Sequence, residues 1–138
     1  MKKRILVVDD NLLNLELVTD LLEAGGFIVC PARTAEESFR AARELSPDLI
    51  LMDLSLPGLD GLAATRTLRA DPATRHLPII ALTAHAMRGD EALALHAGCD
   101  GYLTKPINTR TFATKVASFI AAAGARQTDL ETACKYAN

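Results

Sequence analysis

The sequence predicts an α/β fold, a three-layer α/β/α sandwich built around a five-stranded parallel sheet. Short apolar runs of strand length alternate with longer segments of helical periodicity, and this alternation occurs five times. Parallel strands that alternate with helices require right-handed crossovers, which place helices on both faces of the sheet. The chain has 138 residues, 49% of them hydrophobic, which is enough for one sizeable core and leaves no room for a second folded domain.

Four apolar runs predict strands that are buried on both faces. They are residues 5–8, 28–30, 49–52 and 79–82. Continuous apolarity is typical of parallel strands that helices cover on both sides. A weaker run at residues 101–104 predicts the fifth strand.

The first predicted helix lies between the first two strands. Its apolar residues recur at helical spacing and predict a buried face made of Leu13, Leu17, Leu21, Val18 and Leu22. Two consecutive glycines, Gly25 and Gly26, end this helix because glycine readily leaves the helical conformation.

The remaining helices have start and stop signals of their own. Thr34 and Glu37 form a capping box at the start of the second helix, and Pro47 separates that helix from the third strand. Asp60 and Asn108 can cap the third and fifth helices.

The last two helices complete a domain over residues 1–124. The fourth is expected at about residues 89–97 and has the fewest signals. The fifth has an apolar face made of Phe112, Val116, Phe119, Ile120 and Ala123. Residues 125–138 are polar and mixed in charge, which indicates a helix extension or a loose tail.

Composition excludes several classes of function. Fifteen Lys and Arg against seventeen Asp and Glu give a formal charge of −2 without a block of like charge, so no nucleic-acid surface is indicated. The apolar run after the basic start, residues 5–8, is too short for a signal peptide or a membrane span, and we expect a soluble cytoplasmic protein.

The cysteines and histidines do not predict a metal site. Cys30, Cys99 and Cys134 are odd in number and lack C-x-x-C spacing, which argues against a disulfide framework and a structural zinc site. We expect all three to be reduced and Cys30 to lie in the core. The histidines at positions 76, 85 and 96 also lack ligand spacing, and we expect them at the surface.

Polar residues stand at the carboxyl ends of four predicted strands, where open parallel sheets carry their functional groups. Asp9 and Asp10 follow the first strand, Asp53 follows the third, Thr83 ends the fourth, and Lys105 follows the fifth. Three carboxylates in one crevice repel one another unless a cation compensates. Mg²⁺ suits them because it takes one or two carboxylates, keeps waters and shares phosphate oxygens.

Asp53 is the natural nucleophile toward phosphorus in this set, as carboxylates are in aspartyl-phosphate chemistry. The Thr83 hydroxyl and the Lys105 ammonium are suited to donate to the phosphoryl oxygens. Each acid also has a simpler reading when taken alone: Asp9 and Asp10 could cap a helix, and Asp53 could start a turn.

Two enzyme classes on a similar sheet fit less well. A small phosphatase of the haloacid-dehalogenase kind needs a second acid two residues after its nucleophile, where Ser55 stands. A flavin carrier needs a phosphate-binding loop after the first strand, where residues 9–11 would repel phosphate.

The motifs at these strand ends resemble receiver domains of two-component response regulators. The resemblance covers about residues 3–123, with matches in V-V-D-D-N around Asp9 and Asp10, L-I-L-M-D-L-S-L-P-G-L-D-G at residues 49–61, A-L-T-A at 81–84 and K-P at 105–106. Within the family the chain is similar to the short, stand-alone DivK-like regulators, in D-N-x-x-N at residues 10–14, A-M-R-G-D at 86–90 and A-G-C-D-G-Y-L-T-K-P-I at 97–107.

The resemblance implies a CheY-like strand order, 2-1-3-4-5, and specific chemical roles. Asp53 would be the phosphoacceptor, and Lys105 would bind the phosphoryl group. Asp10 would be the main acidic metal ligand and Asp9 would act partly through water, with the Ser55 backbone carbonyl completing the protein's share of a shell around Mg²⁺ or, in its place, Mn²⁺. Such a protein catalyses its own phosphorylation and dephosphorylation without being a metabolic enzyme.

The resemblance also implies a switch. Thr83 would turn toward the phosphoryl group, Tyr102 would rotate into the vacated space, and the surface made by the fourth helix, fifth strand and fifth helix would change. The Lys105–Pro106 bond would be cis. Ser55 and His85 hold the positions that tune the rate of dephosphorylation.

The expected partner is a histidine kinase, a hybrid kinase or a histidine phosphotransfer protein. Because only residues 125–138 follow the last predicted helix, we expect no DNA-binding output domain. We also expect no membrane contact, and a monomer or a phosphorylation-dependent dimer. A pseudo-receiver, which would work by protein contact without phosphorylation, is the alternative within this fold.

Overall fold

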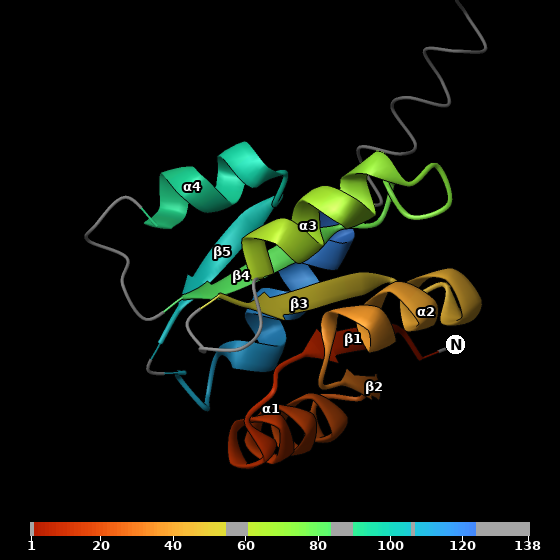
Figure 1. Ribbon diagram of the computed structural model, residues 1–138. Helices are drawn as coiled ribbons and strands as arrows, with labels where there is room; N and C mark the ends of the chain where they lie inside the picture. The colour runs from red at the N-terminus through yellow and green to blue at the C-terminus, as the bar shows by residue number, and fades with distance from the viewer. Residues whose placement is uncertain (1, 55–60, 84–89, 106, 124–138) are drawn as a thin grey trace, which may run out of the picture.

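A computed structural model describes residues 2–54, 61–83, 90–105 and 107–123. Five parallel strands form one sheet in the order β2-β1-β3-β4-β5, which confirms the predicted fold class and strand order (Figure 1). Strands and helices alternate as β1 (Arg4–Val8), α1 (Leu12–Ala24), β2 (Ile28–Ala32), α2 (Ala35–Leu45), β3 (Leu49–Asp53), α3 (Gly61–Ala70), β4 (Ile79–Thr83), α4 (Asp90–Ala97) and β5 (Gly101–Thr104). Residues 112–123 are also helical.

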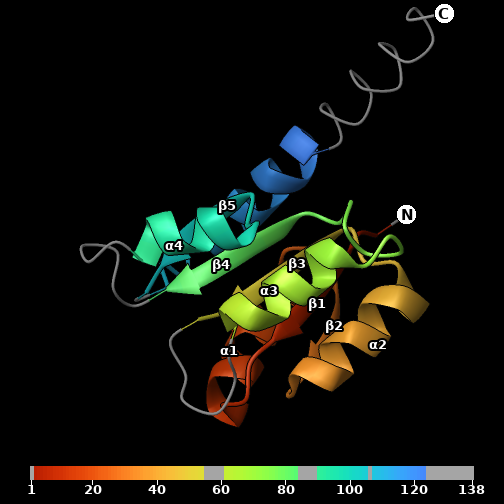
Figure 2. The ribbon, with the colours of Figure 1, turned by 45° about the horizontal axis from the view of Figure 1, so that its top comes forward.

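Helices cover both faces of the sheet, as the two views show (Figures 1 and 2). One face packs against α2, α3 and α4, and the other packs against α1 and the helical residues 112–123. The residues that the structure describes contain no helix long and apolar enough to cross a membrane.

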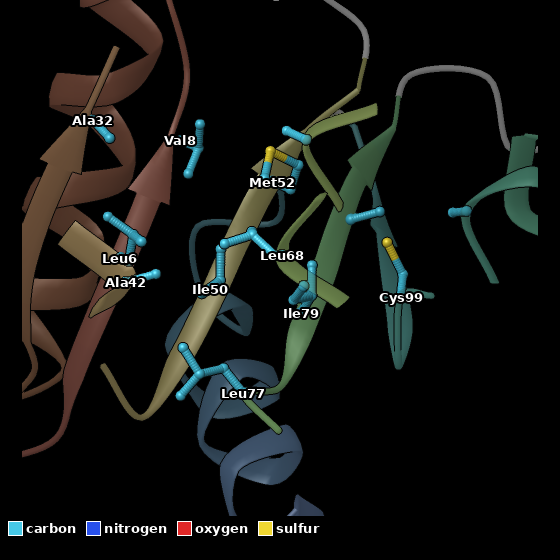
Figure 3. Close-up of a cluster of buried hydrophobic side chains, with 13 residues drawn as sticks. Leu6, Val8, Ala32, Ala42, Ile50, Met52, Leu68, Leu77, Ile79 and Cys99 are labelled. Atoms are coloured by element: carbon cyan, nitrogen blue, oxygen red, sulfur yellow. The ribbon is translucent and has the colours of Figure 1, made fainter. Parts of the chain in front are cut away.

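The core is divided into two clusters because successive residues of a strand point to opposite faces. In β3, Ile50 and Met52 belong to the cluster under α2, α3 and α4, which Figure 3 shows, while Leu49 and Leu51 belong to the cluster under α1. All four side chains are completely buried. Burial on both faces explains why this strand is apolar without interruption.

The predicted buried face of α1 is wrong in part. Leu13 is 78% exposed and Leu17 is 45% exposed, whereas the buried residues are Leu15, Val18 and Leu22. These three residues follow the three-and-four spacing of one helical stripe. Leucine also occupies the adjacent face of this helix, at Leu13 and Leu17. The apolar pattern alone therefore did not distinguish the buried stripe from that adjacent face.

The prediction that the second strand is buried on both faces is also wrong. β2 pairs only with β1 and forms one edge of the sheet, and Ile28 is 43% exposed. Pro31 lies within this strand, opposite Val7. A proline cannot donate to a ladder, so an edge strand is where it is tolerated.

The helix boundaries follow the predicted signals. Thr34 caps α2, and its Oγ1 accepts from the Glu37 N–H at 3.1 Å. The Glu37 carboxylate reaches back as predicted, but it accepts from the Arg33 N–H at 2.6 Å, one residue before the N-cap whose N–H a capping box would bond. Gly25 ends α1, and Gly26 has a φ of 91° that favours glycine.

Candidate functional site

The site lies at the carboxyl edge of the sheet, around the ends of the neighbouring strands β1 and β3. Asp53 is the last residue of β3, and Asp9 follows directly after β1, which pairs with β3. Both residues have an exposed fraction of 0%. Two carboxylates are therefore buried beside each other at the ends of neighbouring strands, a costly arrangement unless each one is hydrogen-bonded and compensated by positive charge.

Lys105 supplies positive charge to this pair. Its Nζ lies 2.5 Å from Asp53 Oδ2, and its side chain is 20% exposed. Lys105 follows β5, and its backbone N–H donates to the Thr83 carbonyl oxygen at 2.8 Å, so that hydrogen bond continues the β4–β5 pairing. From that position the side chain reaches past β4 to the end of β3.

Asn14 also belongs to the site, although it was not among the predicted site residues. Its Nδ2 donates to Asp9 Oδ2 and, at 3.2 Å, to Asp53 Oδ2. The start of α1 holds it in place, because its own N–H donates to the Oδ1 of the N-cap residue Asn11 at 2.9 Å. The D-N-x-x-N spacing was the available signal, since a residue three places after an N-cap lies in the first helical turn beside the preceding strand end.

The surroundings of Asp9, including the neighbouring Asp53, shift the pKa of its carboxyl group. Burial raises the pKa of the Asp9 carboxyl above its ordinary value of 3.8, and the nearby charge of Asp53 raises that pKa further. Hydrogen bonds from the Asn11 N–H, at 2.9 Å, and from the Asn14 amide act in the opposite direction. Asp9 and Asp53 thus repel each other when both are ionised.

The donor chemistry of this edge fits a hard divalent cation. Carboxylate oxygens are the ligands that Mg²⁺ prefers, and a cation between Asp9 and Asp53 would relieve their repulsion. Asp10 is partly exposed. Within the described ranges, no group of three or more His, Cys, Asp and Glu side chains is placed to hold a metal ion, and the role of Asp10 as a ligand stays a prediction.

The remaining predicted site residues fall into two groups. Thr83 ends β4 and is 1% exposed, and Tyr102 lies on β5 opposite Ala81, half-buried against the core cluster of Figure 3. Three predicted positions lie outside the described residues: Ser55, His85 and Pro106, and with Pro106 the predicted cis bond. The predicted Asp60 cap and the tail at residues 125–138 also lie outside them.

The cysteines and histidines that the structure describes stand apart from this edge. Cys30 and Cys99 are free thiols, Cys30 half-buried against the core and Cys99 buried. Burial raises the pKa of the Cys99 thiol, which makes it a poor nucleophile. His76 and His96 are exposed, as predicted.

The fold and the site together define a class of protein: a doubly wound parallel α/β domain with buried carboxylates and a lysine at the carboxyl edge of its sheet. The chain belongs to the response regulator receiver domain family, whose model matches residues 5–117. It is 43% identical over 120 residues to the polar-differentiation response regulator DivK of Brucella ovis, a match that covers 87% of this chain and 98% of that protein.

Solved structures agree with this assignment. The receiver domain of sensor histidine kinase PA1611 from Pseudomonas aeruginosa PAO1, described with a magnesium ion coordinated in its active site cleft, is 37% identical with a TM-score of 0.79, and the match covers 88% of this chain and 99% of that one. A CheY-like receiver domain protein from Methanospirillum hungatei JF-1 is 28% identical with a TM-score of 0.80, covering 91% of this chain and 99% of its own.

Proposed function

We propose that this chain accepts a phosphoryl group on Asp53 from a histidine kinase or a histidine phosphotransfer protein, in a Mg²⁺-dependent reaction. The observation that carries the proposal is the Lys105 ammonium, 2.5 Å from an Asp53 carboxylate that is completely buried at a strand end. A strand end places the carboxylate at the functional edge of the sheet, and the lysine provides a cation for a phosphoryl group attached to it.

In the transfer step, a carboxylate oxygen of Asp53 forms a bond to phosphorus as the bond from phosphorus to the donor imidazole nitrogen breaks. The electron pair of the broken bond stays with the imidazole, which leaves as a neutral ring when its other nitrogen carries a proton. Lys105 and the Thr83 hydroxyl donate to the phosphoryl oxygens. Asp9, Asp10, Asp53 and the Ser55 carbonyl would hold Mg²⁺, which when bound neutralises part of the phosphoryl charge.

The output of the proposed reaction is altered protein binding. Thr83 and Tyr102 lie on the adjacent strands β4 and β5, so a change at the phosphorylation site can reach the surface made by α4, β5 and the helical residues 112–123. Leu93 and Leu95 on α4 are 49% and 50% exposed, which makes this surface suitable for a protein partner in the cytoplasm.

Acetyl phosphate with Mg²⁺ provides the test, with intact-protein mass spectrometry as the measurement. We expect one added phosphoryl group on the native chain, and none after chelation of Mg²⁺ or in Asp53→Asn. Asp71→Asn is the matched control, because Asp71 is a partly exposed ion-pair partner of Arg43 beyond the end of α3 and should not affect the reaction. If the native chain stays unmodified while an active receiver domain in the same buffer is modified, the proposal is wrong.

A further inference from the structure

One amide nitrogen connects the two buried carboxylates of the site. Asn14 Nδ2 donates to Oδ2 of Asp9 and to Oδ2 of Asp53, the second at 3.2 Å. The position of Asn14 does not depend on these bonds alone, because the N-cap of α1 also holds its backbone. The bridge is therefore built into the start of the helix.

Two further hydrogen bonds of these carboxylates leave the amide between them. Asp9 Oδ1 accepts from the Asn11 N–H at 2.9 Å, and Asp53 Oδ2 accepts from Lys105 at 2.5 Å. The Asn14 amide thus donates to Oδ2 of Asp9, the oxygen that does not accept from the Asn11 N–H. On Asp53, both the amide and the lysine donate to Oδ2. A cation held by both acids needs lone pairs on these same two residues.

An amide nitrogen is a weaker compensation for two negative charges than a divalent cation. It carries a partial positive charge and no net charge, so it satisfies hydrogen bonding without cancelling the repulsion between Asp9 and Asp53. It nevertheless stabilises the pair, because hydrogen bonds to charged groups are about twice as strong as neutral ones.

We propose that Asn14 is a placeholder for the divalent cation: its amide bridges Asp9 and Asp53 in the metal-free protein, and Mg²⁺ must displace this bridge to bind. Asn14 therefore stabilises the metal-free form and lowers the affinity for Mg²⁺. The inference rests on the proposed function, which supplies the cation. Asn14 lies outside the predicted set of metal ligands and phosphoryl-binding groups.

Asn14→Leu is the central variant, because leucine has a similar size and no donor. We expect its Kd for Mg²⁺, measured by isothermal titration calorimetry, to fall by at least about tenfold, because the bridge that the cation displaces consists of two hydrogen bonds to charged groups. Its melting temperature should fall in EDTA and return to the native value in saturating Mg²⁺, since the cation then replaces the lost bridge. Asn14→Ala, in which water can enter, gives a second measurement if the leucine variant does not fold.

Thr34→Ala is the matched control, because Thr34 is also an N-cap residue but caps another helix, α2, where its side chain accepts from the Glu37 N–H. We expect it to lower the melting temperature equally in EDTA and in Mg²⁺, and to change the Kd for Mg²⁺ less than twofold.

Two outcomes overturn the placeholder role. Unchanged Mg²⁺ affinity in the Asn14 variants would show that the bridge does not compete with the cation. Weaker affinity would show that Asn14 supports binding of the cation. If the native chain binds Mg²⁺ and is phosphorylated by acetyl phosphate in either case, the proposed function stands without the placeholder. If the native chain binds no Mg²⁺, both proposals fail.

Discussion

Replacing Lys105 with methionine in the metal-free protein removes the ammonium from a buried carboxylate and keeps the length of the side chain. At the observed separation of 2.5 Å, the attraction between unit charges is about 7 kcal/mol at an effective dielectric constant of about 20. Desolvation of Asp53 offsets much of this attraction, and breaking a buried pair by removing one partner costs about 3–5 kcal/mol. Because Lys105 is 20% exposed, we expect a loss near the lower limit, about 3 kcal/mol.

Urea unfolding in EDTA measures this loss. With an m-value of about 2 kcal/mol per M, the midpoint should fall by about 1.5 M. Lys115→Met is the control, because Lys115 is exposed and a surface substitution changes stability by less than about 0.5 kcal/mol. In the Lys105→Met background, Asp53→Asn should restore most of the lost stability, since it removes the charge that the lysine compensated.

The electrostatic account of the site is refuted by either of two results. One is a Lys105→Met variant that is no less stable than Lys115→Met. The other is a double variant that gains nothing from Asp53→Asn, because the cost of losing the lysine would then not come from an uncompensated Asp53 charge.

Three further predictions concern pH, backbone conformation and capping. Because the pKa of Asp9 in the folded protein is raised above its unfolded value of 3.8, the folded protein binds the Asp9 proton more tightly than the unfolded chain does. The stability that this proton contributes should be greatest below pH 3.8 and should be lost as the pH rises through the raised pKa. In urea titrations of the metal-free protein, Asp9→Asn should abolish this trend. Gly98→Ala should cost about 2 kcal/mol in the same assay, since Gly98 has a φ of +118° and an added Cβ would lie 2.7 Å from Arg69 Cγ; a neutral result would contradict the close packing. Thr34→Ala should lower the free energy of unfolding by about 1 kcal/mol, and Thr34→Ser should retain most of it through the same cap.

Much of the fold could be predicted because its signals are local. Each central strand is a continuous apolar run, and helix ends are marked by residues such as Thr34 and Gly25 whose side chains or backbone freedom act within one turn. The edge position of β2 was not predicted from its apolar run, although Pro31 was a signal for it. Strand order came from family resemblance, since a local pattern does not state which strands become neighbours.

The sequence by itself determined the strand–helix alternation and the presence of acids, a hydroxyl and a lysine at strand ends, because backbone preferences and hydrophobic periodicity act over a few residues. Only the tertiary structure decided which stripe of α1 is buried, that Lys105 reaches Asp53 past β4, and that Asn14 bridges Asp9 and Asp53. These contacts join segments up to 52 residues apart, and the packing of helices on the sheet sets their distances. The number of residues between two positions in the sequence does not determine their distance in the folded protein.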